Sequence, residues 1–484
     1  MEKRKVNKYI KKLNNISRRA VDCNDIDKAC MAIRISAAIQ YQWNQNYTDD
    51  DLEKLIEIMA EEKKPLLDRY TSSNNVIMFY DGFGLDTRGL ALIYLKALCD
   101  LGYSVIYVVP EKARNKQPEI TKVTAGKDIS FVYLHNYHGD ILITEMLQLV
   151  QKYRPKDAFF YTTPDDVEAC VCFGAMAERV RRYQINLTDH AFWLGVNAFD
   201  YCIEFREYGA CISNEYRGVN AENILLLHYY PYFDKSVPFA GFAFETKGHP
   251  ILFSGGSIYK TIDPNGTYYD IVAQLLHRHK ELIFIYAGYG DRSELERLQS
   301  KHPGRVFIID ERKDLFALMK QCVLYLNTYP LIGGLMTQYA AAAGRLPLTL
   351  ASSPENSLDG LLLNRDSMHL EFSNKDDLLR EADRLLLDDD YRQQEQEKLS
   401  VIDEVAFMRE LKNILTNGNS NFPVRLYHVN TTDFREWYNT RFTYDQLTSM
   451  IIQSRTRSIW GSFPEMFFYR KVAIRFLKIF NRIL

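Results

Sequence analysis

Short apolar runs alternate with helical stretches from Asn75 to Leu350. NVIMFY at Asn75 and YSVIYVV at Tyr103 are the first two such runs, and ILFSGG at Ile251 opens a second series. Strands that are separated by helices pair in parallel, because each helix carries the chain back along the sheet. The sequence therefore predicts an α/β protein with two successive doubly wound domains.

Changes of pattern along the chain set the expected domain boundaries. Residues 1–72 read as a helical extension, in which Asp49-Asp50-Asp51 form a natural N-cap region before Leu52. Residues 236–250 lie in a passage punctuated by Pro and Gly and are the expected linker. The remaining parts are a first α/β domain at 73–235, a second at 251–417, and a helical region rich in Tyr, Trp and Arg at 418–484.

The expected strands of both domains are short. In the first domain the later strands are placed at Phe131–Leu134, Ala158–Tyr161, Gln184–Leu187 and Ile224–His228. In the second domain they are placed at Leu282–Ala287, Arg305–Ile309, Val323–Asn327 and, as the last strand, Leu346–Leu350. Ligands of such sheets bind at the carboxyl ends of the strands, so we expect a ligand in the cleft between the two domains.

Charge and cysteine spacing exclude several classes of function. The net charge of −2 and the pI near 6.6 argue against binding to nucleic acid by bulk electrostatics. The start, MEKRKVNKYIKKLNN, lacks the apolar run of a secretory signal, and the eight cysteines have no metal-ligand spacing. We expect a cytoplasmic protein with reduced thiols and no metal site.

The last residues, 466–484, form a basic amphipathic pattern. Lys471, Arg475, Lys478 and Arg482 recur on one helical face among apolar residues. A helix of this kind binds an anionic bilayer, which predicts peripheral attachment to the inner leaflet of the cell membrane. The alternative is a helix that packs on the protein itself.

The segment Val323–Leu348 reads as strand, glycine turn and helix. Gly333 and Gly334 allow a tight turn before the helix, whose first amides have no partner within the helix and favour an anion. A phosphate is the predicted ligand, and an ordinary strand-to-helix turn is the alternative.

Three other strand ends of the second domain carry glycines or cations. They supply Gly255, Gly256, Ser257 and Lys260 after one strand, Gly288 and Gly290 after the next, and Arg312 after a third. Because parallel strands end at one edge, these loops are expected to converge with Thr328–Thr337. Lys260 and Arg312 would bind a diphosphate, although each alone is more typical of a solvated loop.

These positions resemble the nucleotide-sugar transferases of the GT-B fold, which have two Rossmann-like domains. Within that superfamily the sequence is similar to protein O-GlcNAc transferase and its bacterial relatives, which have a diphosphate-binding Lys after one strand and an NGxTT turn before a helix that ends in AG-x-P. The matching segments are SGGSIYKTIDP with Lys260, Gly333–Thr337, and Gly344–Pro347. The resemblance implies donor contacts from Leu335, Met336 and Thr337, and a reaction without metal or cofactor. Leu335 or Met336 replaces the first Thr of NGxTT and Tyr339 replaces an acidic residue, so the prediction extends to a nucleotide sugar but to no named sugar.

In the first domain, Asp189-His190 directly follow a predicted strand. An imidazole near neutral pKa can take the proton of an acceptor hydroxyl, and Asp189 can orient it. His190, Asp189 and Lys260 are therefore the predicted catalytic residues. A structural or binding role for His190 is the alternative.

The loop DGFGLDTRG at Asp81 has glycines spaced GxGxxxxG, which is not the dinucleotide fingerprint. In similar GT-B enzymes the first glycine-rich loop lies beneath the acceptor, which implies that role for Gly82, Gly84 and Arg88. A plain turn capped by Asp86 or Thr87 is equally compatible.

These features together predict a metal-independent hexosyl- or N-acetylhexosaminyl-transferase. It would move a sugar from a nucleoside-diphosphate donor to a hydroxyl of a surface glycan, and the basic tail favours a lipid-linked acceptor. The alternatives are a sugar-nucleotide 2-epimerase of the same fold and a non-catalytic GT-B binding module.

Overall fold

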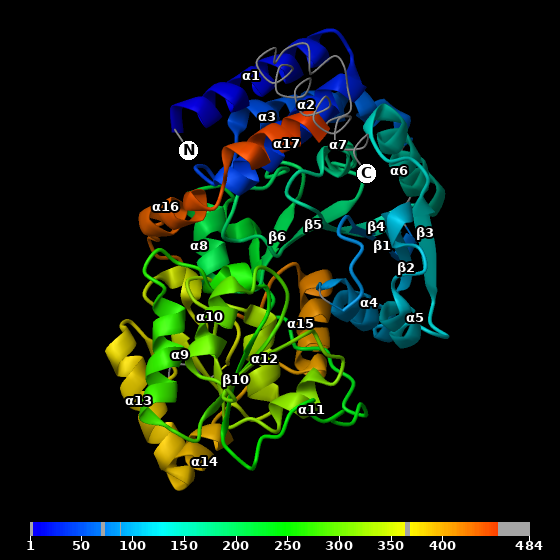
Figure 1. The fold of residues 1–484 in the computed structure, drawn as a ribbon. Coiled ribbons are helices and arrows are strands. Elements are labelled where there is room, and N and C mark those ends of the chain that lie inside the picture. Colours follow the sequence, from blue (N-terminus) through cyan, green and yellow to red (C-terminus); the bar gives the residue numbers. More distant parts are fainter. Residues whose placement is uncertain (1–2, 69–72, 88, 364–367, 454–484) are drawn as a thin grey trace, which may run out of the picture. The chain divides into compact units, whose positions relative to one another are not determined.

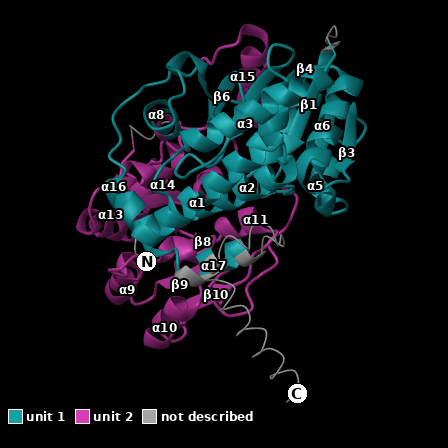
Figure 2. Cartoon of the chain, turned by 90° about the horizontal axis from the view of Figure 1, so that it is seen from above, with its two compact units in different colours: residues 1–204, 209–226, 422–484 teal, residues 205–208, 227–421 magenta. Residues whose placement is uncertain are grey.

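The structure, a computed structural model, describes residues 3–68, 73–87, 89–363 and 368–453. The chain forms two compact units, each built from separate stretches of sequence (Figure 2). Unit 1 comprises residues 1–204, 209–226 and 422–484, and unit 2 comprises residues 205–208 and 227–421. Each unit contains its own parallel sheet, as the alternating pattern predicts.

The sheet of unit 1 has seven strands in the order β3-β2-β1-β4-β5-β6-β7, all paired in parallel (Figure 1). The chain runs outward from β1 to β3 and then returns to the other side of β1 to form β4, so the direction of winding reverses between β1 and β4. The strands are β1 (Ser73–Asp81), β2 (Ser104–Pro110), β3 (Ile129–Leu134), β4 (Pro155–Tyr161), β5 (Arg181–Asn186), β6 (Tyr201–Glu204) and β7 (Ile224–Leu226).

Helices connect these strands, and further helices of unit 1 precede and follow the sheet within the described residues. Asp25 and Asp49 cap α2 and α3, because their carboxylates accept hydrogen bonds from the amides of Lys28 and Leu52. The helices are α1 (Lys3–Asp22), α2 (Ile26–Trp43), α3 (Asp50–Lys63), α4 (Ala91–Asp100), α5 (Pro118–Val123), α6 (Gly139–Tyr153), α7 (Val167–Ala175), α8 (Glu207–Glu215, divided by the unit boundary), α16 (Thr432–Thr440) and α17 (Tyr444–Gln453).

The helical N-terminus packs against the helices near the C-terminus. Trp43 at the end of α2 lies against Phe442, with ring centroids 6.3 Å apart, and both belong to a buried cluster that includes Ile451 of α17. Figure 1 shows α1, α2, α3 and α17 lying together. The N-terminal helices are confirmed, and residues 432–453 complete their packing.

The sheet of unit 2 has six parallel strands in the order β10-β9-β8-β11-β12-β13. Here the winding reverses between β8 and β11. The strands are β8 (Ile251–Gly255), β9 (Ile283–Ala287), β10 (Val306–Ile309), β11 (Leu324–Leu326), β12 (Leu346–Leu350) and β13 (Glu371–Phe372). The helices are α9 (Thr267–Arg278), α10 (Ser293–Lys301), α11 (Leu315–Met319), α12 (Gly334–Ala342), α13 (Lys375–Leu387), α14 (Asp389–Glu397) and α15 (Glu404–Asn417), with a 3-10 helix, η4, at Ile258–Thr261.

Three strand predictions were wrong in detail. β6 was missed, because its four residues include the buried Glu204, whose carboxylate accepts a hydrogen bond from Asn186. The last strand is β13 and not Leu346–Leu350, and β13 is only two residues long. β7 ends at Leu226, two residues before the predicted end at His228. The Nδ1 of His228 is hydrogen-bonded to the carbonyl oxygen of Phe205, 2.7 Å away.

Among the described helices, none combines the length and the apolar character that crossing a membrane requires. The predicted basic tail, 466–484, lies outside the described residues.

Candidate functional site

The loops that follow β8 and β11 flank the point where the winding of the unit 2 sheet reverses. In open parallel sheets this is the position at which ligands bind. Gly255 at the end of β8 lies directly beside the first turn of α12, since a Cβ placed on it would be 2.8 Å from the Met336 methyl carbon and 2.8 Å from the Ala287 carbonyl oxygen. The two glycine-bearing loops are therefore neighbours.

The turn before α12 is organised by Asn327. Its side-chain oxygen accepts hydrogen bonds from the amides of Gly333 and Thr328, both at 3.0 Å. Its side-chain nitrogen donates to Thr337 Oγ1 at 2.8 Å and to Thr349 Oγ1 at 3.3 Å. Asn327 thus holds the turn in place and satisfies the amide of Gly333, while the next amides begin the helix at Gly334.

Lys260 reaches the same turn from η4. Its Nζ donates to the carbonyl oxygen of Ile332 at 3.1 Å, one residue before Gly333. The structure therefore brings Lys260 together with Gly333 and Gly334, as convergence of the strand ends implies. A cation at this place adds to the positive end of α12.

A buried tyrosine hydroxyl also borders the turn. A Cβ on Gly333 would lie 3.5 Å from the hydroxyl of Tyr325, which has no hydrogen-bond partner within the part of the chain that the structure describes. On the other side, a Cβ on Gly334 would lie 2.6 Å from the hydroxyl of Tyr229. Both glycines therefore permit close approach to a hydroxyl donor.

The loop after β9 is joined to the loop after β8 by backbone contacts. The amide of Ile258 donates to the carbonyl of Tyr289 at 2.9 Å, and the amide of Gly256 donates to the carbonyl of Ala287 at 2.9 Å. Gly288 has no room for a side chain, since a Cβ would lie 1.9 Å from the carbonyl oxygen of Gly256. Gly290 has a φ of +131°, which favours glycine.

Other predicted donor residues are engaged inside the protein. Arg312 donates to Asp314 at 2.7 Å and to the carbonyl of Gly241 at 2.6 Å, so it anchors the segment before β8. The hydroxyl of Thr328 donates to Leu331 O at 2.6 Å, and that of Thr337 donates to Gly333 O at 3.1 Å. Each of these two hydroxyls therefore holds its own loop in place, and the side chain of Leu335 is half-buried.

In unit 1 the predicted glycine loop lies at the corresponding reversal, between β1 and β4. Asp81 is fully buried at the end of β1 and accepts hydrogen bonds from the amides of Phe83 and Gly84 and from the hydroxyl of Tyr107. Burial raises its pKa to about 6. Gly82 approaches the loop after β4, because a Cβ on it would lie 2.6 Å from a carboxylate oxygen of Asp166. Arg88 lies outside the described residues.

His190 and Asp189 follow β5 and contact the C-terminal helices. The Nδ1 of His190 is 3.3 Å from Asp189 Oδ1, and its ring lies 6.2 Å from that of Phe434 and 6.1 Å from that of Tyr438 on α16. The imidazole is 19% exposed and Asp189 is buried. Sequence alone gave no sign of this aromatic surround, because α16 lies more than two hundred residues further along the chain.

Sequence reasoning missed Asn327, Asp81 and Asp166. Burial raises the pKa of Asp166 to about 6, and its carboxylate accepts a hydrogen bond from the Tyr80 hydroxyl at 2.7 Å. Carboxyl groups with a shifted pKa beside a glycine loop are candidates for acid-base catalysis. The sequence did contain a signal for two of these residues, because Asp81 and Asn327 are polar and each ends an apolar run that forms a strand. Within the described residues no group of three His, Cys, Asp or Glu side chains is arranged to hold a metal ion.

Comparison with known proteins identifies the fold. No protein-family model and no curated sequence matches the chain. Among solved structures, an O-GlcNAc transferase mutant from Thermobaculum terrenum superposes with a TM-score of 0.52 at 14% identity, over 89% of this chain and 82% of that one. The chain has a GT-B-like fold.

Two further solved structures superpose with the chain. Anabaena HepE, in complex with UDP and glucose, has a TM-score of 0.52 at 12% identity, covering 70% of this chain and 99% of that one. A putative UDP-N-acetylglucosamine 2-epimerase from Listeria monocytogenes has a TM-score of 0.51 at 10% identity, covering 74% and 100%. The GT-B-like fold therefore has glycosyltransferases and 2-epimerases among its neighbours.

Proposed function

We propose that the chain is a glycosyltransferase that moves a sugar from a nucleoside-diphosphate sugar to a hydroxyl of a surface glycan. The observation that carries the proposal is the meeting of Lys260, the start of α12 and the glycine loops at the reversal of the unit 2 sheet. Helix amides and a lysine together make a diphosphate site. Anabaena HepE, a structural neighbour in complex with UDP and glucose, supports this choice of ligand.

In this proposal the diphosphate lies on the amides that follow Gly333, with Lys260 as its counter-ion. The loops at Gly288 and Gly290 contact the nucleoside. As the bond from the anomeric carbon to the diphosphate oxygen breaks, negative charge grows on the leaving group, and the lysine and the helix amides stabilise it. These charges are fixed by the protein, so this step uses no metal.

The acceptor side is assigned to unit 1. The acceptor hydroxyl forms the new glycosidic bond, and its proton passes to His190, whose imidazole Asp189 orients. The loop of Gly82 and Gly84 contacts the acceptor. A lipid-linked glycan at the inner leaflet of the cytoplasmic membrane is the proposed acceptor, because the sequence of 466–484 favours an anionic bilayer.

Replacing Lys260 by Ala is expected to abolish most of the stabilisation that a nucleotide gives. Ligand binding raises stability by RT ln(1 + [L]/Kd), so the rise in Tm reports affinity. We would measure it for UDP, GDP, CDP and dTDP. Lys301→Ala, an exposed change in α10 of the same unit, is the control and should respond as the parent does. An equal response in both variants would remove Lys260 from the site.

Replacing Asn327 by Asp is expected to weaken nucleotide binding at least tenfold while the turn persists. One carboxylate oxygen still accepts the hydrogen bonds of Gly333 and Thr328. The hydroxyls of Thr337 and Thr349, which accept from Asn327, can rotate to donate to the other oxygen. The substitution places a buried negative charge beneath the proposed diphosphate. Titration calorimetry with the best nucleotide measures the loss. Asn374→Asp makes the same change at the N-cap of α13, where either residue caps well, and should leave binding unchanged. Unaltered affinity in Asn327→Asp would place the diphosphate elsewhere.

The 2-epimerase is the second candidate, because a protein with that description has the same fold. Incubation with UDP-GlcNAc alone, followed by NMR, separates the two functions. Formation of the 2-epimer without an acceptor would overturn the transferase. A protein that binds no nucleoside diphosphate in the Tm panel would instead be the non-catalytic module.

A further inference from the structure

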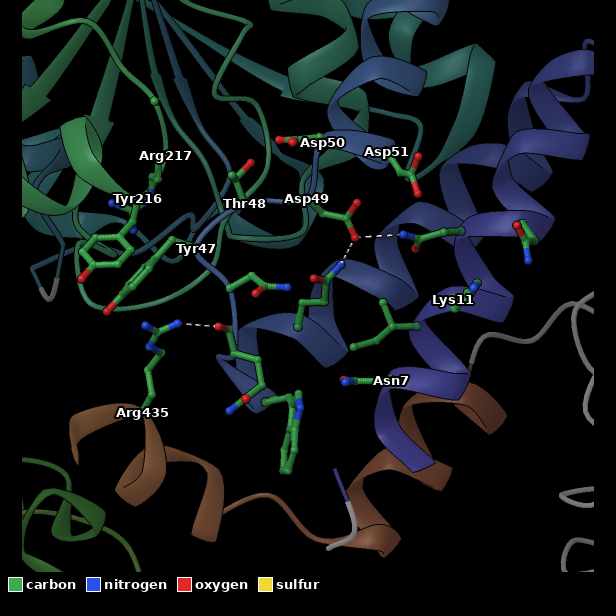
Figure 3. A pocket seen from close by; sticks show the side chains of 18 of the residues that line it. Asn7, Lys11, Tyr47, Thr48, Asp49, Asp50, Asp51, Tyr216, Arg217 and Arg435 are labelled. Atoms are coloured by element: carbon green, nitrogen blue, oxygen red, sulfur yellow. Dashed lines mark hydrogen bonds between the residues drawn. The ribbon is translucent and has the colours of Figure 1, made fainter. Parts of the chain in front are cut away.

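A pocket of about 1100 Å³ opens in the helical part of unit 1 (Figure 3). None of the residues that line it was assigned above to the donor or the acceptor site. Its wall is formed by α1, the segment that joins α2 to α3, the segment around Arg217, and α16. It is larger than the roughly 300–1000 Å³ of pockets that take a drug-sized ligand. The space accommodates more than one sugar ring.

Part of this wall is held rigidly by internal hydrogen bonds. The Asp49 carboxylate accepts hydrogen bonds from Asn14 at 2.8 Å and Gln40 at 2.7 Å, and it caps α3. The guanidinium of Arg435 donates to the carbonyl of Gln45 at 2.6 Å and lies 5.5 Å from the ring centroid of Tyr47. Figure 3 shows both sets of bonds, on opposite sides of the pocket.

Other polar groups of the wall remain available. Among the described residues, Asn7, Lys11 and Asp50 have no side-chain partner, and Figure 3 shows all three beside the pocket. The exposed side chains of Asn7, Lys11 and Asp50 are therefore free to bind a ligand that carries both donors and acceptors.

The charges of the wall select the class of ligand. Four carboxylates and four cations line the pocket, so its net charge is zero. A phosphate-rich or sulfated ligand would meet as many like charges as opposite ones, and an apolar ligand would bury polar groups without partners. Hydroxyl groups both donate and accept, which suits carboxylates, amides and cations side by side. The partly exposed Tyr216 adds an aromatic side chain to the wall, and such a side chain can pack against the C–H face of a sugar ring.

We propose that this pocket binds a neutral oligosaccharide. This pocket contains none of the residues of the proposed nucleotide site in unit 2, and the proposal does not depend on that site. Binding there would retain a glycan chain on unit 1.

The test is a glycan microarray that carries neutral and acidic oligosaccharides, followed by calorimetry with the neutral ligand that binds best. The full chain is compared with the double variant Lys11→Ala, Asp50→Ala, which removes one charge of each sign from exposed positions of the wall. The variant is expected to bind the glycan at least tenfold more weakly and to keep the nucleotide response of the parent.

The control is Lys8→Ala, Asp22→Ala, which alters the same charges on exposed positions of α1 outside the pocket. It should bind the glycan as the parent does. The proposal is overturned if no neutral glycan binds, if only acidic glycans bind, or if the two double variants bind equally well. Because glycan binding and nucleotide response are measured separately, failure of one proposal leaves the other to its own test.

Discussion

Replacing Glu53 by Gln is expected to remove a large loss of stability that the protein undergoes as the pH rises from about 4.5 to about 8. Glu53 of α3 is 2% exposed, and its two carboxylate oxygens accept from the amide of Gly195 at 2.9 and 3.2 Å. Burial, reinforced by the charge of Asp49, raises its pKa to about 8. At neutral pH the side chain is therefore a neutral acid in the folded protein.

The direction of the effect follows from proton binding. Between about pH 4.5 and 8 the folded protein holds a proton on Glu53 that the unfolded chain has released. Stability therefore falls by about 1.4 kcal/mol for each pH unit in this window, or roughly 5 kcal/mol in all, and is flat on either side. Gln keeps the acceptor for Gly195 and has no proton to lose, so the variant becomes the more stable protein as the pH rises.

Urea unfolding at several pH values measures this difference between variant and parent. Taking the difference cancels the contributions of other buried acids such as Asp81 and Asp166. Glu57→Gln makes the same change at an exposed position one turn further along α3 and is expected to leave the pH dependence unchanged. Parallel stability curves for Glu53→Gln and the parent would show that Glu53 is ionised in the folded state.

Replacing Gly288 by Ala is expected to destabilise unit 2 by about 3 kcal/mol and to weaken nucleotide binding. The added Cβ would lie 1.9 Å from the carbonyl oxygen of Gly256 and 2.9 Å from its carbonyl carbon. Both neighbours are backbone atoms, so the loops after β8 and β9 must separate. These loops carry the proposed nucleoside contacts, and stability and binding should therefore fall together.

Gly304→Ala is the matched control for this change. Gly304 also lies in unit 2, has open space around its Cβ position and a φ of +72°, so Ala there incurs only the left-handed strain of about 1–2 kcal/mol. Its nucleotide response, measured as the rise in Tm, should match that of the parent. Equal losses of stability in the two variants would contradict the prediction, because separating the loops would then cost no more than the strain at Gly304.

Local patterns were sufficient to predict the sheets and the position of the glycine loops. The periodicity of apolar residues, the positions of glycines and the direction of the strands are local properties of a few residues each. Gly255, Lys260 and Gly333 could therefore be assigned to one edge of the sheet before any contact was known. The roles of Arg312 and His190 could not be read in this way. Arg312 is engaged by Gly241, 71 residues earlier, and His190 by Phe434. Such contacts depend on tertiary packing, which a single sequence does not display.

The two ends of the chain illustrate the same limit. The carbonyl of Gln45 accepts from Arg435 across 390 residues, and no periodic pattern announces that pairing. Asn327 was overlooked for a related reason. A single amide after an apolar strand is unremarkable until its four hydrogen bonds are visible.

The path of the chain makes both units discontinuous. It passes from one unit to the other after Glu204, Tyr208, Leu226 and Asn421. A fragment ending at Asn421 would retain the whole of unit 2 but lose α16 and α17, leaving the buried face of α2 around Trp43 uncovered. The packing of unit 1 is therefore completed only after the C-terminal helices have been synthesised, and we expect its two pieces to reassociate in trans when they are expressed as separate polypeptides.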